Sequence, residues 1–378
     1  MGEIEFIFNK IKKVKSVMLK LLILKSSVLL YLFSSFMSAT AGGVKDLEVF
    51  HRESQSFITF KEDKDVKGER YRVYQSDKPI TEKNVKGLKP IAILEEGSSR
   101  LRFRDSKSKF PTFEKLGIKN AVIQDMDKGG KPLSNDTGLL VWTVKKAAAT
   151  YYAVVLEKDG KSAGSPVLGI NSLKKPVAEK TGVPGAIKIQ HREPGMWIYM
   201  YWNDYTLWNP RVLDDCPIGI ANVFQIMLPK KKELWTKSLA VNIEPHGYGA
   251  LGHMRNSTSS MGKFNWIKIL PKNFMNTWHY GHSNAMTKTD YLDRKFRVIK
   301  KGVVVNYFWH EMNFLVKWVM KKPANFTTIN PDPNRIYMKG FSQGGTGANT
   351  VGIRHGELFA SVNPDKGICN WTREKVGT

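Results

Sequence analysis

Residues 335–345 read RIYMKGFSQGG, and this stretch decides how the second half of the chain is expected to fold. Its first five residues form a near-continuous apolar strand, and a helix-compatible stretch ending at Gly356 follows. Between them, residues 340–344 fit the pattern G-x-S-x-G, which in this setting places a serine on a sharp strand-to-helix turn. The glycines are needed because side chains there would collide with the crossing helix and strand. The pattern therefore predicts that the Ser342 hydroxyl stands at the carboxyl edge of a sheet, where the helix dipole favours developing negative charge.

A second stretch adds a family resemblance. Residues 238–244, SLAVNIE, read as a strand and run into residues 245–249, PHGYG. This loop and the blocks 332–348 and 354–362 resemble the matching parts of the secreted serine α/β-hydrolases, particularly their esterase and prolyl-oligopeptidase-like branches. The similarity covers roughly residues 239–364. A Gly-rich turn between a strand and a helix, without chemistry, is the structural alternative.

The resemblance implies roles for four residues. Ser342 would attack a carbonyl, and the backbone N–H groups of Tyr248 and Gln343 would hold the oxyanion, with His246 in a structural role. The domain in question is expected over residues 196–378, where strands alternate with a helix and favour a mainly parallel, covered sheet. Strands are expected at 197–201, 223–228, 239–243, 266–270, 335–339 and 358–362, with a helix over 310–322.

The carboxylate and the histidine that this family places after its nucleophile are missing from the pattern. His355 is the one histidine after Ser342, and a helix rising 1.5 Å per residue would hold it about 20 Å away, too far for a general base. Asp365, expected just after the strand 358–362, is a candidate acid, with a turn residue as the alternative. We therefore expect a truncated chain that ends inside the sheet and is inactive as it stands. A complete chain that lost catalysis and kept binding is the alternative.

Seven histidines precede the serine, against the order of the family, and the candidates among them are His253, His279, His282 and His310. Residues 278–284, WHYGHSN, could line a pocket, but a polar loop is the preferred interpretation. No histidine pair has zinc-ligand spacing with a third partner, and Cys216 and Cys369 form no CxxC motif. The sequence therefore predicts no metal and no other cofactor, and it leaves open whether the two cysteines form a disulfide.

Residues 44–173 show a different periodicity, because short alternating segments separated by turns predict an all-β sandwich. The segments are 47–50, 56–60, 71–74, 91–94, 101–103, 139–142 and 151–155. Residues 68–76 and 150–161 resemble strands C and F of fibronectin type III domains, with an enlarged loop around 107–137. Residues 174–195, with three prolines and three glycines, are predicted to be a linker or a first crossing strand. The expected fold class is thus mixed, with a fibronectin III-like sandwich followed by a partial α/β-hydrolase domain.

Residues 1–41 are predicted to be a secretory signal peptide. A lysine-rich stretch precedes the apolar run 28–37, and residues 38–42, SATAG, fit a small-residue cleavage site after Ala41. A start at Met18 would give the leader ordinary proportions. We expect a secreted or periplasmic protein, with an uncleaved membrane anchor as the alternative.

The charge balance favours contact with polyanions. The chain holds 59 Lys and Arg against 34 Asp and Glu, a formal net charge of +25. The lysines are scattered and do not flank aromatic stacking platforms, so no nucleic acid is expected. The leading hypothesis is an exported serine hydrolase that cleaves a small-molecule, peptide or polysaccharide ester, or a peptide bond. The alternatives are a non-catalytic secreted binding protein for anionic polysaccharide or envelope, and a basic envelope-associated structural protein.

Overall fold

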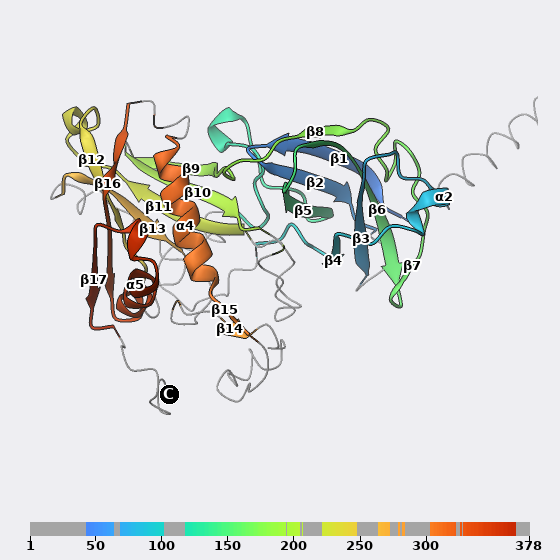
Figure 1. Ribbon diagram of the computed structural model, residues 1–378. Coiled ribbons are helices and arrows are strands. Elements are labelled where there is room, and N and C mark those ends of the chain that lie inside the picture. Colours follow the sequence, from blue (N-terminus) through green and yellow to red (C-terminus); the bar gives the residue numbers. More distant parts are fainter. Residues whose placement is uncertain are drawn as a thin grey trace, which may run out of the picture.

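The computed structural model describes most of the chain between residues 43 and 367 (Figure 1). The described residues are 43–63, 69–101, 118–193, 195–204, 206, 221–247, 264–272, 279, 282–283, 303–322, 326 and 328–367. The predicted signal peptide, Tyr248, His253 and both cysteines lie outside them. None of the described helices combines the length and the apolar character that crossing a membrane requires.

Two antiparallel sheets form the N-terminal part. One has the order β1-β2-β5, and the other has the order β4-β3-β6-β7, with β8 also pairing to β6. Their strands are β1 (Lys45–Arg52), β2 (Gln55–Lys61), β3 (Arg70–Ser76), β4 (Ala92–Glu95), β5 (Thr137–Thr143), β6 (Ala148–Lys158), β7 (Lys161–Ser162) and β8 (Val177–Glu179). The helices α2 (Glu82–Val85) and η2 (Met126–Lys128) are single turns within connections.

Alternate residues of both sheets meet in an apolar core. Ile58 and Leu140 from one sheet and Tyr71 and Val154 from the other are fully buried there, as period-two alternation requires. Of the strand predicted at 101–103, only Leu101 is described. Leu101 lies outside any strand, so the prediction is wrong at this residue, although its N–H donates to the Lys119 carbonyl. The fibronectin type III identity of the two sheets stays a prediction.

A seven-stranded sheet forms the C-terminal part, with the order β17-β16-β12-β13-β11-β10-β9. Its strands are β9 (Ile187–Glu193), β10 (Met196–Trp202), β11 (Ala221–Met227), β12 (Ser238–Ile243), β13 (Trp266–Pro271), β16 (Asn330–Phe341) and β17 (Ser361–Asp365). A separate pair joins β14 (His282–Ser283) to β15 (Val304–Val305), and η3 (Lys232–Leu234) and η6 (Gly356–Leu358) are short 3₁₀ turns.

The expectation of a mainly parallel sheet is only partly right, because the large sheet is mixed. Strands β13, β12, β16 and β17 run parallel, whereas β9, β10, β11 and β13 pair antiparallel. The direct cause at β9 and β10 is the short connection between Glu193 and Met196, since parallel neighbours need a much longer crossover. The segment 174–195, predicted as linker or crossing strand, contains β8 and β9.

The helix α4 (Tyr307–Met320) covers one face of the large sheet (Figure 1). It begins three residues before the predicted start at 310, because the Asn306 side chain caps it by accepting a hydrogen bond from the Trp309 N–H, 3.0 Å away. The predicted apolar face is buried as expected. Trp318 packs against Tyr199 of β10 and Phe224 of β11, with ring centroids 4.9 and 5.0 Å away.

Of the two N-terminal sheets, the sheet β1-β2-β5 covers the opposite face of β9, β10 and β11. Phe57 and Val141 are buried in one apolar cluster with Ile198 and Met200 of β10, while the intervening Tyr199 belongs to the cluster on the α4 side. Both faces of β10 are therefore buried, each against a different layer. The two parts of the chain share a hydrophobic core across this contact.

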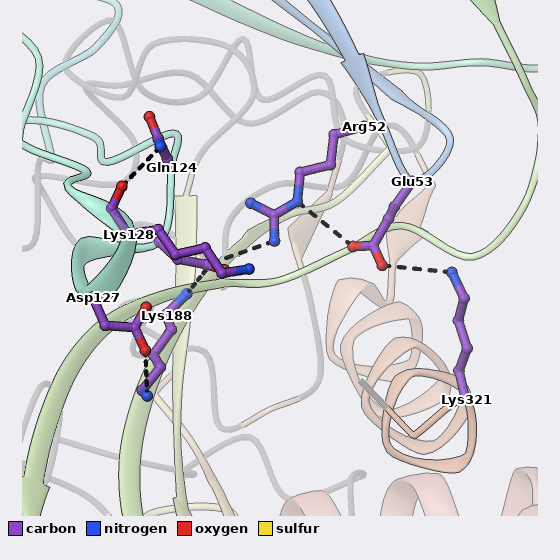
Figure 2. A network of polar contacts seen from close by, with 8 residues as sticks. Arg52, Glu53, Gln124, Asp127, Lys128, Lys188 and Lys321 are labelled. Atoms are coloured by element: carbon purple, nitrogen blue, oxygen red, sulfur yellow. Dashed lines mark hydrogen bonds and ion pairs between the residues drawn. The ribbon is translucent and has the colours of Figure 1, made fainter. Parts of the chain in front are cut away.

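Charged groups surround this shared core (Figure 2). Glu53, in the turn between β1 and β2, lies 3.8 Å from Arg52 and 3.7 Å from Lys321 at the end of α4. Lys188 of β9 contacts Asp127 of η2 at 2.7 Å. Because the Glu53 and Lys321 side chains are substantially exposed, such pairs contribute little stability, and the apolar cluster carries the contact.

Candidate active site

Ser342 lies in the turn between β16 and α5 (Gln343–Arg354), where the sequence predicts it. Its backbone has φ +55° and ψ −119°, a conformation that residues with a side chain rarely adopt. Such a conformation costs on the order of 1–3 kcal/mol and persists only where the surrounding structure imposes it. The Ser342 N–H donates to the Asp365 carbonyl at 2.9 Å, which ties the turn to the end of β17.

Two glycines allow the chain to cross itself at this turn. A Cβ added to Gly340 would lie 2.0 Å from the Gly344 carbonyl oxygen, and a Cβ added to Gly344 would lie 2.3 Å from the Pro245 carbonyl oxygen. Both distances are far below van der Waals contact, so only glycine fits either position. The G-x-S-x-G pattern thus reflects real crowding of the backbone on both sides of Ser342.

The Ser342 side chain does not cap the helix that follows it. It is half-buried, and its hydroxyl makes no capping hydrogen bond to α5. The first amides of a helix have no partner within the helix, so the Gln343 N–H is available beside this hydroxyl. The N-terminal end of α5 adds a partial positive charge at the same place.

The loop after β12 passes directly beside this turn. Gly247 approaches the Phe341 carbonyl, since a Cβ on Gly247 would lie 3.5 Å from that oxygen. His246 is buried, with its Nδ1 3.0 Å from the Gly247 carbonyl oxygen. Tyr248, predicted to supply the second oxyanion N–H, comes next in the chain and lies outside the described residues. The described loop therefore ends at the point where that donor is expected.

Asp365 differs in position from the prediction. We expected it after a strand at 358–362, but β17 begins at Ser361 and Asp365 is its last residue. Residues 356–358 form the turn η6, because the chain must first cross from α5 to the sheet edge. Asp365 pairs in register with Phe341, and its side chain is exposed. Its backbone, not its carboxylate, is the group that bonds to Ser342.

The described histidines supply no hydrogen-bond partner for the Ser342 hydroxyl. His355 lies at the far end of the twelve-residue helix α5, stacked on Trp309, with its Nδ1 3.3 Å from Glu357 Oε1. His310 lies on α4, where burial and nearby His355 lower its pKa. Of His282 only the backbone is described, in β14. Among the described residues, no histidine side chain is therefore hydrogen-bonded to the Ser342 hydroxyl.

His279 corrects the interpretation of residues 278–284 as a polar loop. Its side chain is fully buried, its backbone has φ +59°, and its Nε2 lies 2.9 Å from the His246 carbonyl oxygen. Burial, together with the neighbouring His246, lowers its pKa to about 3. No sequence pattern identified this residue, because a single histidine in a turn has no periodicity.

The described residues contain no cluster of three or more His, Cys, Asp or Glu side chains that could hold a metal ion. The described polar groups near Ser342 include the Asp365 carbonyl, which accepts from the Ser342 N–H, and the contacts of His246 and His279 in and beside the loop after β12. Such an arrangement can stabilise a developing negative charge on an oxygen, and it offers no carboxylate cage to a cation.

No protein-family model and no curated protein matches the sequence. Among solved structures, the chain is similar to S-formylglutathione hydrolase from Staphylococcus aureus, with 14% identity and a TM-score of 0.24 over 46% of this chain and 58% of that chain. It is also similar to a ferulic acid esterase from Anaeromyces mucronatus, with 14% identity and a TM-score of 0.26 over 50% and 66%. A third similar structure is a thermostable esterase, with 13% identity and a TM-score of 0.25 over 84% and 76%.

These structural neighbours are a hydrolase and two esterases. The chain covers less than two thirds of the length of the first two. With TM-scores this low, the similarity carries no argument about activity.

Proposed function

We propose that this protein is a serine hydrolase that cleaves an ester or a peptide bond by acyl transfer through Ser342. The observation that carries the proposal is the strained backbone of Ser342 between β16 and α5, with glycines where the crossing chains leave no room for a Cβ. A tight turn without chemistry gains nothing from a strained serine, since glycine would adopt φ +55° at lower cost. Strain at a polar side chain beside free amides is typical of a catalytic nucleophile.

The proposed reaction proceeds in two steps. Ser342 Oγ forms a bond to the substrate carbonyl carbon while a base takes the hydroxyl proton, and the carbonyl oxygen becomes an oxyanion. The Gln343 N–H at the start of α5 and the N–H of Tyr248 donate to that oxyanion. Collapse returns the proton to the departing alcohol or amine and leaves an acyl group on Ser342. Water then hydrolyses this ester and regenerates the serine.

The proposal extends to location and substrate class. Residues 1–41 have the pattern of a cleavable leader, which supports export. An exported enzyme with net charge +25 would meet anionic polymers and their esters readily, so a small-molecule or carbohydrate ester is the substrate class we favour. N-terminal sequencing of the mature protein would test the export proposal, because a start at Gly42 is expected and an intact N-terminus contradicts it.

A fluorophosphonate probe tests the catalytic proposal directly. Ser342 Oγ should replace fluoride on phosphorus, and peptide mapping should find the adduct on the peptide that contains Ser342. Ser342→Ala should abolish labelling without lowering the unfolding midpoint, because it removes only one hydroxyl. Ser361→Ala, an exposed serine of the neighbouring β17, is the matched control and should label normally. Absence of any adduct on folded wild-type protein would refute the proposal.

That negative result would favour the second candidate function, a non-catalytic binder of anionic polysaccharide. The observation in its favour is the excess of 59 basic over 34 acidic residues. Retention on a heparin column that falls steeply with salt, together with no labelling, is the outcome expected of such a binder.

A further inference from the structure

His279 occupies the space between the loop after β12, the helix α4 and the helix α5. Its ring centroid lies 4.7 Å from that of His246 in the loop and 4.4 Å from that of Phe308 at the start of α4. On the third side, a Cβ on Gly347 of α5 would lie 2.8 Å from the His279 side chain. The absence of a Cβ at Gly347 is therefore what admits the imidazole at this depth.

The hydrogen bond of His279 fixes its tautomer. The His246 carbonyl oxygen, 2.9 Å from Nε2, can only accept, so Nε2 carries the proton and donates. Nδ1 is then a bare acceptor, and it has no hydrogen-bond partner. Burial lowers the pKa of His279 to about 3, so the ring stays neutral across the ordinary pH range. With Nε2 committed to the carbonyl, His279 is unsuited to act as the base for Ser342.

A packing role alone does not account for a histidine here. A buried nitrogen without a partner destabilises the folded state, and phenylalanine would fill a similar volume without that cost. The gain from histidine is the single N–H donated to His246. That carbonyl lies in a loop whose next residue, Gly247, approaches the Phe341 carbonyl of the Ser342 turn.

We infer that His279 is a positioning residue that holds the loop 245–247 at a fixed distance from the start of α5, and thereby sets the spacing of the two oxyanion donors. One donor, the Gln343 N–H, belongs to α5, and the other, the Tyr248 N–H, follows the loop. His279 contacts both elements, through Gly347 on one side and His246 on the other. This inference rests on the proposed serine hydrolase function.

Two variants separate the hydrogen bond from the packing. His279→Phe keeps a ring in the cavity and removes the donor, whereas His279→Gln retains an N–H that can reach the His246 carbonyl. We expect His279→Phe to label with the fluorophosphonate at least about tenfold more slowly, because a misplaced oxyanion donor weakens transition-state binding. We expect His279→Gln to recover much of that rate, and the pH profile of labelling to be unchanged in both variants.

A control variant and a second measurement keep the test decisive. Phe308→Leu loosens the same cavity without touching the hydrogen bond, so it should lower the unfolding midpoint and leave the labelling rate close to wild type. Hydrogen exchange of the segment 245–250 should speed up in His279→Phe but not in Phe308→Leu. Wild-type labelling and exchange in His279→Phe would overturn the inference. If wild-type protein does not label at all, the proposed function fails, and unchanged exchange in His279→Phe then shows independently that His279 does not hold the loop.

Discussion

Removal of one aromatic ring from the contact between the two parts of the chain should destabilise the whole protein. Phe57 of β2 is 3% exposed and meets Trp202 of β10 edge-on, with ring centroids 5.5 Å apart. Nearby, the Gln55 Nε2 donates to the Trp202 carbonyl at 3.0 Å. Phe57 therefore belongs to the N-terminal sheets by sequence and to the shared core by packing.

The cost of Phe57→Ala follows from the volume it leaves empty. Truncation of a buried phenylalanine costs about 3–5 kcal/mol when the surrounding side chains cannot collapse. Strands of two sheets border this site, and both are fixed by their own ladders, so we expect a value in that range. For a chain of 378 residues, this corresponds to a fall in the unfolding midpoint of about 4–6 °C.

Differential scanning calorimetry is the appropriate assay, because it separates one transition from two. If the shared core couples both parts, wild type shows one transition and Phe57→Ala moves all of it. Leu168→Ala is the control, since Leu168 is 40% exposed on the same N-terminal part and should change stability by less than about 0.5 kcal/mol. Two transitions in wild type, with only one of them shifted by Phe57→Ala, would refute the reasoning.

Two further predictions concern the large sheet and its carboxyl edge. Burial raises the pKa of Glu311 from 4.5 to about 8, although the interaction with the Tyr201 side chain lowers it. Between these pH values the folded chain therefore keeps a proton that the unfolded chain releases. The free energy of unfolding should therefore fall as the pH rises from about 4.5 to about 8. Glu311→Gln should reduce the total fall over this pH range by at most about 5 kcal/mol, measured by urea unfolding. The same pH dependence in both proteins would contradict the assignment to Glu311. Gly344→Ala would place a Cβ 2.3 Å from the Pro245 carbonyl oxygen, so fluorophosphonate labelling should be lost and stability should fall by at least about 1 kcal/mol. Gly356→Ala, where a Cβ would meet nothing within 4 Å, is its control, and equal effects of both changes would argue against crowding as the cause.

The turn at Ser342 was predictable because its requirements are local. Strand β16, the strained serine and the helix α5 are consecutive in the chain, and each crowded position is marked by a glycine within five residues of Ser342. The start of α4 was harder to predict from the sequence. The sequence indicates the apolar face from residue 310, but the first turn depends on the Asn306 cap, whose side chain is one of several polar groups that precede the helix.

Strand direction in the large sheet was not predictable from hydrophobicity. β10 reads MWIYMYW and is buried at every position. A strand that is apolar on both faces indicates that a layer covers each face. The same sequence is expected whether the neighbouring strand is parallel or antiparallel. The sequence could therefore have suggested that something packs on each face of β10, and it could not have shown that the N-terminal sheets form one of those layers.

His279 shows why part of the candidate site could not be assigned from the sequence, which offered this histidine as a candidate but indicated neither its burial nor its partner. The imidazole contacts three segments that are distant in the chain, namely the loop at His246, the start of α4 at Phe308 and the helix α5 at Gly347. Each of these has an ordinary local explanation, as a loop residue, a core residue and a helix glycine. Only their spatial convergence gives the histidine its role. Motifs of consecutive residues can therefore indicate the proposed nucleophile, whereas the residue proposed to position the loop beside it becomes visible only once the fold brings those segments together.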